Sequence, residues 1–215
     1  MATVYKLHPE TPQSSRVETI RDALQNGAVM LYPTDTVYAI GCDLNAKSAV
    51  ERVRRIKQLS NDKPLTFLCP SLSNIAQYAV VTDAAYRLIR HLIPGPYTFL
   101  LPATKLVPRL VQNPKRKTTG IRVPNHPISQ ALLQSLGNPI ISTSAPTVVR
   151  SENAPLTQAE LFDQLEKSVD IIIDDESFVG YQVSTILDLT GEEPLVIRKG
   201  AGWEAVADLE MAVQG

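Results

Sequence analysis

Two apolar runs meet at a polar elbow in the segment Tyr32-Pro33-Thr34-Asp35-Thr36-Val37-Tyr38-Ala39-Ile40-Gly41-Cys42. The run Ala28-Val29-Met30-Leu31 leads into the proline, and a carboxylate flanked by two threonine hydroxyls follows before the chain becomes apolar again. Apolar runs bounded by a proline and short polar side chains are typical of two strands joined by a turn. Such side chains often bind the backbone of their own loop, so the elbow alone indicates a tight polar turn. A functional interpretation is favoured by the later chain, where polar groups recur at strand ends.

Composition places the chain among globular proteins. Its 215 residues are enough for one large or two small domains, and 44% of them are apolar, which suits a sizeable buried core. The formal net charge of -1 gives no global attraction for nucleic acid, so a basic binding surface must be local. The N-terminus lacks a charged stretch followed by an apolar one, and no apolar run approaches the length of a membrane span. We therefore expect a cytoplasmic protein without a membrane partner.

The cysteines and histidines do not form a metal-binding pattern. Cys42 and Cys69 lie far apart in apolar runs, without a CxxC motif or a nearby histidine, so we expect both to be buried as small hydrophobic residues. The histidines are His8, His91 and His126, and no two are spaced as a metal pair. We expect no protein-ligated metal, which leaves room only for a magnesium ion that arrives with a nucleotide.

Helical and extended segments alternate along the rest of the chain. A capping box Ser15-x-x-Glu18 predicts a helix that ends at Asn26-Gly27, and an apolar stripe from Ala49 to Ile56 predicts a second helix with a basic C-terminal turn. Further helices are expected over 73–79, after a Thr82 cap, over 127–136 and after a Thr157 cap, and further strands over 65–69, 97–101, 118–123, 140–144, 169–173, 184–189 and 195–198. Polar loops are expected over 59–64, 108–117 and 147–156. This order predicts one α/β (α+β) domain over 1–215, with its core at about 15–200 and a mixed sheet of about seven strands flanked by helices.

Polar side chains stand at the ends of several predicted strands. Besides the elbow they are Arg122, Ser142, Thr143, Ser144, Ser184, Thr185 and Arg198. Open α/β sheets bind ligands at strand ends, so a shared edge would place hydroxyl donors and two arginines around one cleft. The arginine fork suits a carboxylate or a phosphate. Taken singly, each arginine also fits an ordinary surface position, Ser184-Thr185 can simply begin a strand, and Lys57 can simply satisfy the end of a helix.

The sequence contains no Walker A loop, GxGxxG or GxSxG motif, but it contains an ordered series of other motifs. They are Tyr-Pro-Thr-Asp-Thr at 32–36, Lys57, Lys63-Pro64-Leu65, Pro94-Gly95-Pro96-Tyr97-Thr98, Gly120-Ile121-Arg122-Val123-Pro124-Asn125-His126-Pro127, Ser144-Ala145, Ser184-Thr185-Ile186 and Arg198-x-Gly200. In this order they resemble the YrdC/YciO family from about Gln25 to Gly200. So many ordered motifs do not arise by chance.

The resemblance implies a fold and an activity. Family members have a twisted mixed sheet flanked by helices, with a concave, positively charged face described as able to bind double-stranded RNA. The best-known branch consists of threonylcarbamoyl-AMP synthases, which convert L-threonine, bicarbonate and ATP with Mg²⁺ into threonylcarbamoyl-AMP and pyrophosphate. The product feeds the modification of adenosine 37 in tRNA. Longer members carry an additional C-terminal domain, which we do not expect in this chain.

The resemblance also implies roles for individual residues. Arg122 would pair with the carboxylate of threonine, whose other contacts would come from Thr34, Thr36, Tyr38 and Ser184. Lys57 would be the catalytic cation between that carboxylate and the ATP phosphates, and the nucleotide would further be held by Arg55, Thr118, Ser144 and Arg198. Because a carbamate oxygen attacks the α-phosphorus, cations and positioning suffice, and neither a protein nucleophile nor a tightly bound cofactor is required.

Two motifs depart from the synthase branch. That branch has Lys-x-Arg at the end of the second helix, where this chain has Lys57-Gln58-Leu59, and Ser-x-Asn after a later strand, where it has Ser144-Ala145-Pro146. A missing arginine removes a fixed cation from the triphosphate, a loss on the order of a hundredfold in rate. Proline supplies neither a side-chain amide nor a backbone N–H. Both departures fall on the nucleotide side, and this pattern is similar to the YciO branch.

Three hypotheses follow. The first is a threonylcarbamoyl-AMP synthase of reduced activity. The second is a double-stranded RNA or tRNA-binding module that uses the cations Arg52, Arg54, Arg55, Lys63, Arg109, Lys115, Arg116 and Lys117, although such charge runs are usually solvated surfaces. The third is a divergent paralogue, a ligase or a sensor, that binds another small molecule or nucleotide in the same cleft.

Overall fold

The computed structural model describes residues 1–58, 65–113, 115–145, 157–177, 180 and 182–213, with side chains to residue 208. Its strands are β1 (Thr3–Lys6), β2 (Met30–Tyr32), β3 (Ala39–Asp43), β4 (Thr66–Leu68), β5 (Tyr97–Pro102), β6 (Thr118–Arg122), β7 (Ile140–Ser144), β8 (Ile171–Asp174), β9 (Thr185–Asp188) and β10 (Leu195–Arg198). Its helices are α1 (Ser14–Gln25), α2 (Lys47–Ile56), α3 (Leu72–Tyr78), α4 (Asp83–Leu92), α5 (Pro127–Leu136), α6 (Gln158–Leu165) and α7 (Trp203–Val213). The expected loops at 59–64 and 147–156 lie outside the described residues.

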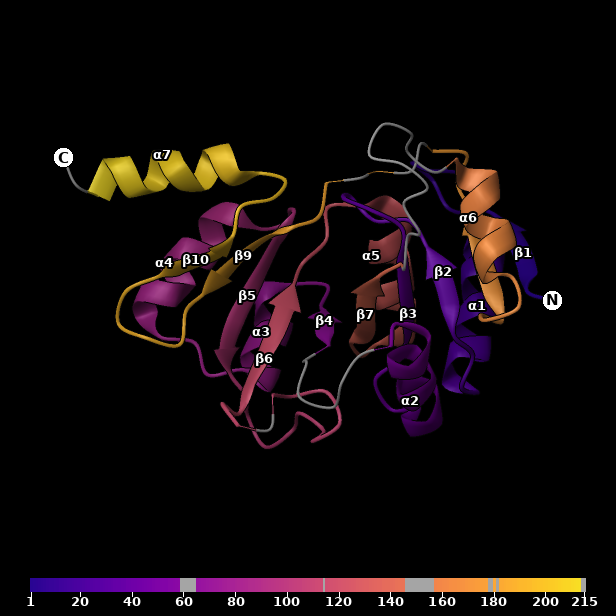
Figure 1. The fold of residues 1–215 in the computed structure, drawn as a ribbon, viewed down its shortest axis with the longest axis horizontal. Helices are drawn as coiled ribbons and strands as arrows, with labels where there is room; N and C mark the ends of the chain where they lie inside the picture. Colours follow the sequence, from indigo (N-terminus) through magenta and orange to yellow (C-terminus); the bar gives the residue numbers. More distant parts are fainter. Residues whose placement is uncertain (59–64, 114, 146–156, 178–179, 181, 214–215) are drawn as a thin grey trace.

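One mixed sheet runs through the molecule in the order β1-β8-β2-β3-β7-β4-β6-β5-β9-β10 (Figure 1). The mixed α/β architecture is confirmed, but the described residues form ten strands, so the expected number of about seven was too low. The N-terminal strand β1 was missed because it is short and largely exposed, so it carries no apolar run and is extended through its parallel pairing with β8. Helix α7 was missed as well. The two termini lie at opposite ends of the molecule (Figure 1).

The elbow is the turn of the hairpin formed by β2 and β3. The two strands pair antiparallel, with Met30 opposite Gly41 and Tyr32 opposite Ala39, as the two apolar runs predict. A Cβ atom at position 41 would lie 2.8 Å from the Tyr32 ring and 3.0 Å from the Ile141 carbonyl oxygen, so only glycine fits between β2 and β7. Strand β3, which follows the elbow, is therefore packed closely between β2 and β7.

Helix ends follow local sequence signals in most cases. The Thr82 hydroxyl accepts a hydrogen bond from the amide of Ala85, and Thr157 forms a capping box at the start of α6. Helix α5 begins with Pro127 and ends at Gly137 in the left-handed conformation, at φ 74°. The capping box expected at Ser15 was wrong: Ser15 is already helical, and among the described residues no side chain caps α1.

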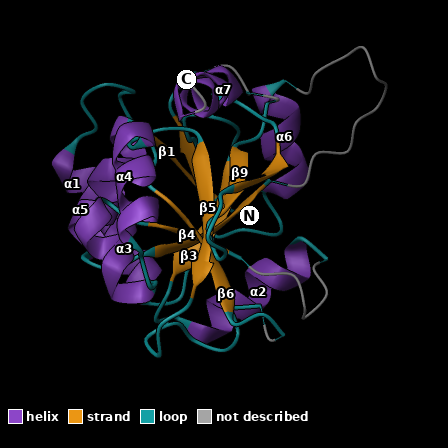
Figure 2. Cartoon of the chain, turned by 90° about the vertical axis from the view of Figure 1, so that its left-hand side faces the viewer, coloured by secondary structure: helices purple, strands orange, loops and turns teal. Residues whose placement is uncertain are grey.

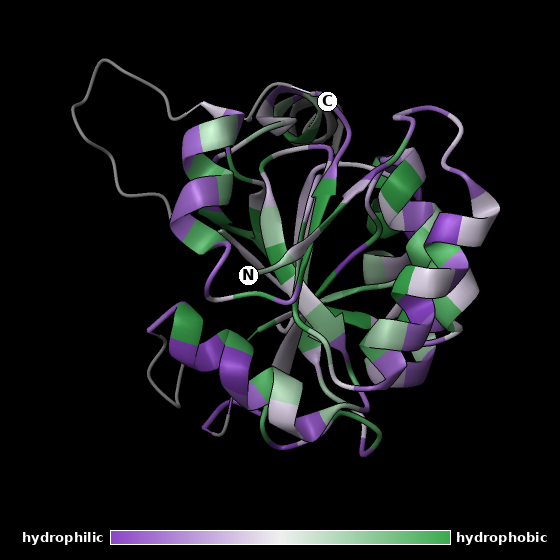
Figure 3. Cartoon of the chain, turned by 90° about the vertical axis from the view of Figure 1, so that its right-hand side faces the viewer, coloured by the Kyte–Doolittle hydropathy of each residue, from purple (hydrophilic) through white to green (hydrophobic). Residues whose placement is uncertain are grey.

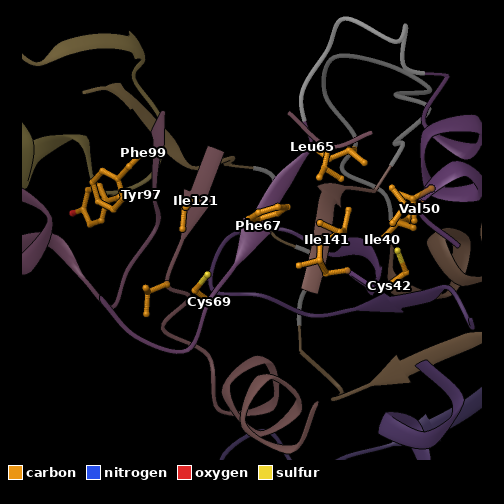
Figure 4. Packing of buried hydrophobic residues seen from close by; sticks show 14 of the residues in the cluster. Ile40, Cys42, Val50, Leu65, Phe67, Cys69, Tyr97, Phe99, Ile121 and Ile141 are labelled. Atoms are coloured by element: carbon orange, nitrogen blue, oxygen red, sulfur yellow. The ribbon is translucent and has the colours of Figure 1, made fainter. Parts of the chain in front are cut away.

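Two hydrophobic clusters hold the helices on the sheet. Figure 2 shows α1, α3, α4 and α5 grouped on one side of the sheet, with α2 and α6 on the other. Helices α1 and α5 pack on residues of β2, β4, β7 and β8, while the larger cluster joins α2, α3, α4 and α6 to the sheet. The helices are amphipathic, with apolar and polar residues on different faces (Figure 3). The larger cluster contains both cysteines, which are fully buried as expected (Figure 4). In the described part of the chain, no helix is long and apolar enough to cross a membrane.

Candidate functional site

A cavity of about 160 Å³ lies over the middle of the sheet, and we call it the cleft. Its walls come from the elbow and from strands β3, β4, β5, β6, β7, β9 and β10. Its lining residues are Thr34, Thr36, Val37, Ala39, Thr66, Leu68, Thr98, Arg122, Ser142, Thr143, Ser144, Val183, Ser184, Ile186 and Arg198. Hydroxyl groups and two guanidinium groups therefore stand around a partly apolar floor.

Strand register explains why these residues meet. Residues directly opposite each other in neighbouring strands point to the same face of a sheet. Ser144 pairs with Ala39, Ser142 with Thr66, Leu68 with Arg122, and Ile186 with both Thr98 and Arg198. All of these residues line the cleft. The strand-end groups expected to share one cleft are thus brought together, with the exception of Thr185, which is buried and donates to the Ala201 carbonyl at 2.9 Å.

The elbow is folded around the hydroxyl of Thr34. This hydroxyl donates to the carbonyl of Val37 at 2.7 Å and accepts from the amide of Thr36 at 3.2 Å. It also lies 3.0 Å from the hydroxyl of Thr36. The self-contained turn expected from the sequence is present, and both threonines face the cleft at the same time. The turn and the functional interpretation of the elbow are therefore compatible.

Arg122 enters the cleft from the end of β6 and is bound by the elbow. Its Nη2 donates to Oδ1 of Asp35 at 2.5 Å, and its Nη1 donates to the hydroxyl of Thr36 at 3.0 Å. Both side chains of the ion pair are buried, with 8% and 11% of their surface exposed. Among the described residues, Nε of Arg122 and Oδ2 of Asp35 have no hydrogen-bond partner. A buried, partly unsatisfied guanidinium beside a cavity can bind an added carboxylate or phosphate oxygen.

Ser184 and Arg198 form the opposite wall. The hydroxyl of Ser184 lies 2.9 Å from that of Thr98 and accepts from Nη2 of Arg198 at 3.1 Å, while Nε of Arg198 donates to the Ser184 carbonyl at 2.9 Å. Burial, together with the charge of Arg122, lowers the pKa of Arg198. A positive potential between the two arginines favours an anion in the cleft.

Lys57, at the end of α2, is not among the described lining residues, but it contacts one of them, Ser144. Lys57 is the C-cap residue of α2. Its Nζ donates to the hydroxyl of Ser144 at 3.2 Å and to the carbonyl of Ala145 at 3.5 Å. Burial lowers the pKa of this amine. Lys57 therefore does more than satisfy a helix end, because it joins α2 to the serine that lines the cleft.

Besides Lys57, three further residues predicted to bind substrate or nucleotide are not among the described lining residues. The side chain of Tyr38 is buried, and its hydroxyl donates to Oδ1 of Asp175 at 2.7 Å, away from the described lining residues. Tyr38 follows the elbow at the point where β3 begins, so its side chain turns into the core. Thr118 lies four residues before Arg122 in β6 and is buried, and Arg55 is exposed on α2. None of the three is among the described lining residues.

The cations predicted to bind RNA are not one surface. Arg52 is paired with Asp170 at 2.7 Å, and the guanidinium of Arg54 is buried and donates to the Leu110 carbonyl at 2.9 Å. Both arginines thus hold α2 in place. The exposed members are Arg55, Arg109, Lys115, Arg116 and Lys117, and Lys63 lies outside the described residues. Among the described members, Arg109 and the run at 115–117 lie in one connection, between β5 and β6.

Several residues of the cleft carry little signal in the sequence. Thr66 and Thr98 lie within short apolar strands, and only the register places them beside Ser142 and Ser184. Asp35 was part of the elbow motif, but its pairing with Arg122 joins residues 87 positions apart. Across the described residues, no cluster of histidine, cysteine, aspartate and glutamate could hold a metal ion.

Comparison with known proteins gives this arrangement a family. The Sua5/YciO/YrdC family model, described as "Telomere recombination", matches residues 22–200, and the chain belongs to this family. The chain is 42% identical over 202 residues to the uncharacterized protein YciO of Escherichia coli K12, covering 94% of this chain and 97% of that protein. It is 31% identical over 189 residues to a threonylcarbamoyl-AMP synthase of Vibrio vulnificus, covering 86% and 99%. The resemblance seen in the sequence is confirmed.

Solved structures agree with this assignment. The crystal structure of E. coli YciO superposes with a TM-score of 0.86 over 94% of this chain and 97% of that chain. P. abyssi Sua5, solved in complex with L-threonine, is 24% identical and superposes with a TM-score of 0.84 over 97% of this chain and 61% of its own. The latter likeness shows the shared fold. A relative at 31% identity is thus named as a synthase, while a relative at 42% identity is an uncharacterized YciO protein.

Proposed function

We propose that the protein is an ATP-dependent synthase of the threonylcarbamoyl-AMP type, with reduced activity. It binds L-threonine, bicarbonate and ATP, and it releases threonylcarbamoyl-AMP, pyrophosphate and water. The product supplies the threonylcarbamoyl group for adenosine 37 of tRNA. The family, and a relative with this name at 31% identity, support the class of reaction.

The observation that carries the proposal is the surrounding of Arg122. Its guanidinium faces the cleft, has a buried Nε without a partner in the described part of the chain, and stands among the hydroxyls of Thr34, Thr36 and Ser184. An amino-acid carboxylate suits this fork, and the hydroxyls suit the polar groups of threonine. Arg122 therefore binds the carboxylate, and the three hydroxyls orient the amine and the side chain.

The nucleotide lies on the other side of the same cleft. Lys57, held by Ser144, and Arg198, held by Ser184, supply positive charge for the phosphates. Mg²⁺ enters with ATP as part of the substrate. The carbamate formed from threonine and bicarbonate attacks the α-phosphorus, the bond to the β-phosphate oxygen breaks, and pyrophosphate leaves. Lys57 stabilises the charge that grows on the phosphates, which makes it the catalytic residue.

Pyrophosphate release tests the proposal. The protein is incubated with ATP, Mg²⁺ and bicarbonate, with and without L-threonine, and the adenylate is detected by mass spectrometry. We expect threonine-dependent release of pyrophosphate that is lost in Lys57→Met and retained in Arg55→Met. Arg55 is the control because its side chain is exposed on α2 and is not among the described lining residues. Release that does not depend on threonine contradicts the proposal and favours a divergent paralogue. A thermal-shift screen of other amino acids and nucleotides then identifies the true ligand.

RNA binding is a second candidate, supported by one loop. Lys115, Arg116 and Lys117 are consecutive and exposed, and the Arg116 guanidinium lies 3.6 Å from the carboxylate of Asp188. Cations held beside the sheet can contact phosphates of double-stranded RNA or tRNA. The affinity should fall steeply with salt and should weaken in Lys115→Glu/Lys117→Glu. Affinity that is independent of salt, or equal in this variant, rules the loop out.

A further inference from the structure

A buried carboxylate outside the cleft joins the segments that build it. Asp175 follows β8, has 2% of its surface exposed, and is not among the described residues that line the cleft. Its Oδ1 accepts from the hydroxyl of Tyr38 at 2.7 Å and from the hydroxyl of Ser177 at 2.7 Å. Its Oδ2 lies 3.5 Å from Nε2 of His126. Three stretches of chain that are far apart in sequence therefore meet at one carboxylate.

Each of these stretches carries part of the cleft. Tyr38 comes directly after the elbow that presents Thr34 and Thr36. His126 lies four residues after Arg122, at the start of α5. The segment of Asp175 leads toward Ser184 and passes Gly180, where a Cβ atom would collide with the carbonyl oxygen of Thr36. The elbow thus has Arg122 on one side and the segment that contains Gly180 on another.

We propose that Asp175 is a positioning residue for the cleft, holding the elbow through Tyr38 and the segment after β6 through His126. Gln158 supports the contact, because its Nε2 donates to the Tyr38 hydroxyl at 2.9 Å. A hydrogen bond to a charged acceptor in a buried site fixes its donor more firmly than a hydrogen bond to a neutral acceptor does. When this carboxylate is lost, the elbow moves, and the two threonines and Arg122 lose their mutual geometry. A shift of about 1 Å at such a site is enough to cost a large factor in rate.

The chain offers a matched control in Asp188. It is also buried, lies at the end of β9, and accepts from the amide and hydroxyl of Thr190 at 3.0 and 2.6 Å. Asp175 accepts from the amide and hydroxyl of Ser177 in the same way, at 3.2 and 2.7 Å. In both Asp175→Asn and Asp188→Asn, Oδ1 still accepts in the turn and the charge is lost, and Asp188→Asn also loses the ion pair with Arg116 at 3.6 Å. Only Asp175→Asn takes the charge from the bond to Tyr38 and sets an amide N–H group against His126.

Hydrogen exchange of the elbow tests the inference without reference to catalysis. Exchange is followed by mass spectrometry in peptides that cover residues 33–38. We expect faster exchange in Asp175→Asn than in the wild type, and wild-type exchange in Asp188→Asn. Equal exchange in all three proteins overturns the inference. If Asp175→Asn does not fold, Tyr38→Phe, which removes only the hydroxyl, decides in its place.

The kinetic readout rests on the proposed function. In Asp175→Asn we expect the KM for L-threonine to rise about tenfold while the KM for ATP stays within about twofold. The double variant Asp175→Asn/Tyr38→Phe should be little worse than either single variant, because the two changes act on the same hydrogen bond, the first by removing its charge and the second by removing its donor. If the KM for L-threonine and the KM for ATP rise by the same factor, the positioning role is overturned. A wild type without threonine-dependent turnover refutes the proposed function instead, and hydrogen exchange then still decides the role of Asp175.

Discussion

The carboxylate of Asp35 is bound to the guanidinium of Arg122, with 2.5 Å between Oδ1 and Nη2. Only Arg122 of this pair lines the cleft among the described residues, so Asp35, together with Thr36, fixes the guanidinium at the wall of the cleft. The pair joins the elbow to the end of β6. It is the link through which two distant motifs of the sequence become one site.

Removal of Asp35 should destabilise the protein clearly. Asp35→Ala leaves a buried guanidinium without its counter-ion, which costs about 3 kcal/mol in the free energy of unfolding. Asp22→Ala is the control, because the pair of Asp22 with Arg21 is largely exposed and contributes less than about 1 kcal/mol. Urea denaturation measures both. Equal losses for the two variants would show that the buried pair contributes no more than a surface pair.

The two cysteines should be inert in the native protein. Burial, with a contribution from Asp43, raises the pKa of Cys42 to about 12, and burial raises that of Cys69 to about 12. Since the thiolate is the reactive form, a thiol reagent at pH 8 should label neither residue until the protein unfolds. The labelling rate should follow the unfolding rate when denaturant is added. Rapid labelling of folded protein contradicts this burial.

Acid should weaken the protein through Asp175. Burial alone would raise the pKa of this carboxyl, but His126, Ser177 and Tyr38 stabilise its charge more and lower the pKa to about 2. A depressed pKa stabilises the fold above the unfolded pKa of about 4, and this contribution is lost as the pH falls to about 2. The difference in unfolding free energy between wild type and Asp175→Asn should therefore shrink by about 2 kcal/mol from pH 5 to pH 2. If this difference in unfolding free energy does not depend on pH, the Asp175 carboxylate does not stabilise the fold through its charge.

The departures from the synthase motifs offer a gain-of-function experiment. Leu59 and Pro146 lie outside the described residues, so the prediction comes from the sequence alone. Leu59→Arg restores a cation for the triphosphate and Pro146→Asn restores an amide, and together they should raise kcat/KM for ATP by on the order of tenfold or more. The control is Lys57→Met/Leu59→Arg/Pro146→Asn, which should stay inactive. No gain in the double variant would mean that these positions do not limit the activity.

Local signals in the sequence predicted most helices and strands, but the pairing of strands that are far apart in sequence became known only from the structure. Pro127 and Gly137 mark the two ends of α5, and Thr157 with Glu160 starts α6, because proline, left-handed glycine and capping side chains act on their neighbours. Strand β1 could not be predicted in this way, because its partner β8 lies about 170 residues further on.

The same difference applies to the site. Motifs in the sequence predicted that one binding site contains Thr34, Arg122, Ser144, Ser184 and Arg198. The sheet register brings these residues to one cleft. Tyr38 belongs to the same motif as Thr34, yet its side chain faces Asp175. Spacing along the chain does not reveal this direction, because it depends on where β3 begins.

Calorimetric binding of L-threonine to the wild type and to Arg122→Lys tests the central claim most directly. Lysine keeps the charge beside Asp35 but loses the planar fork, so we expect L-threonine to bind the wild type and to bind Arg122→Lys at least about tenfold more weakly. L-Threoninamide, which has no carboxylate, should bind the wild type about as weakly as threonine binds the variant. Threonine that binds both folded proteins equally, or neither, would contradict a carboxylate site at Arg122.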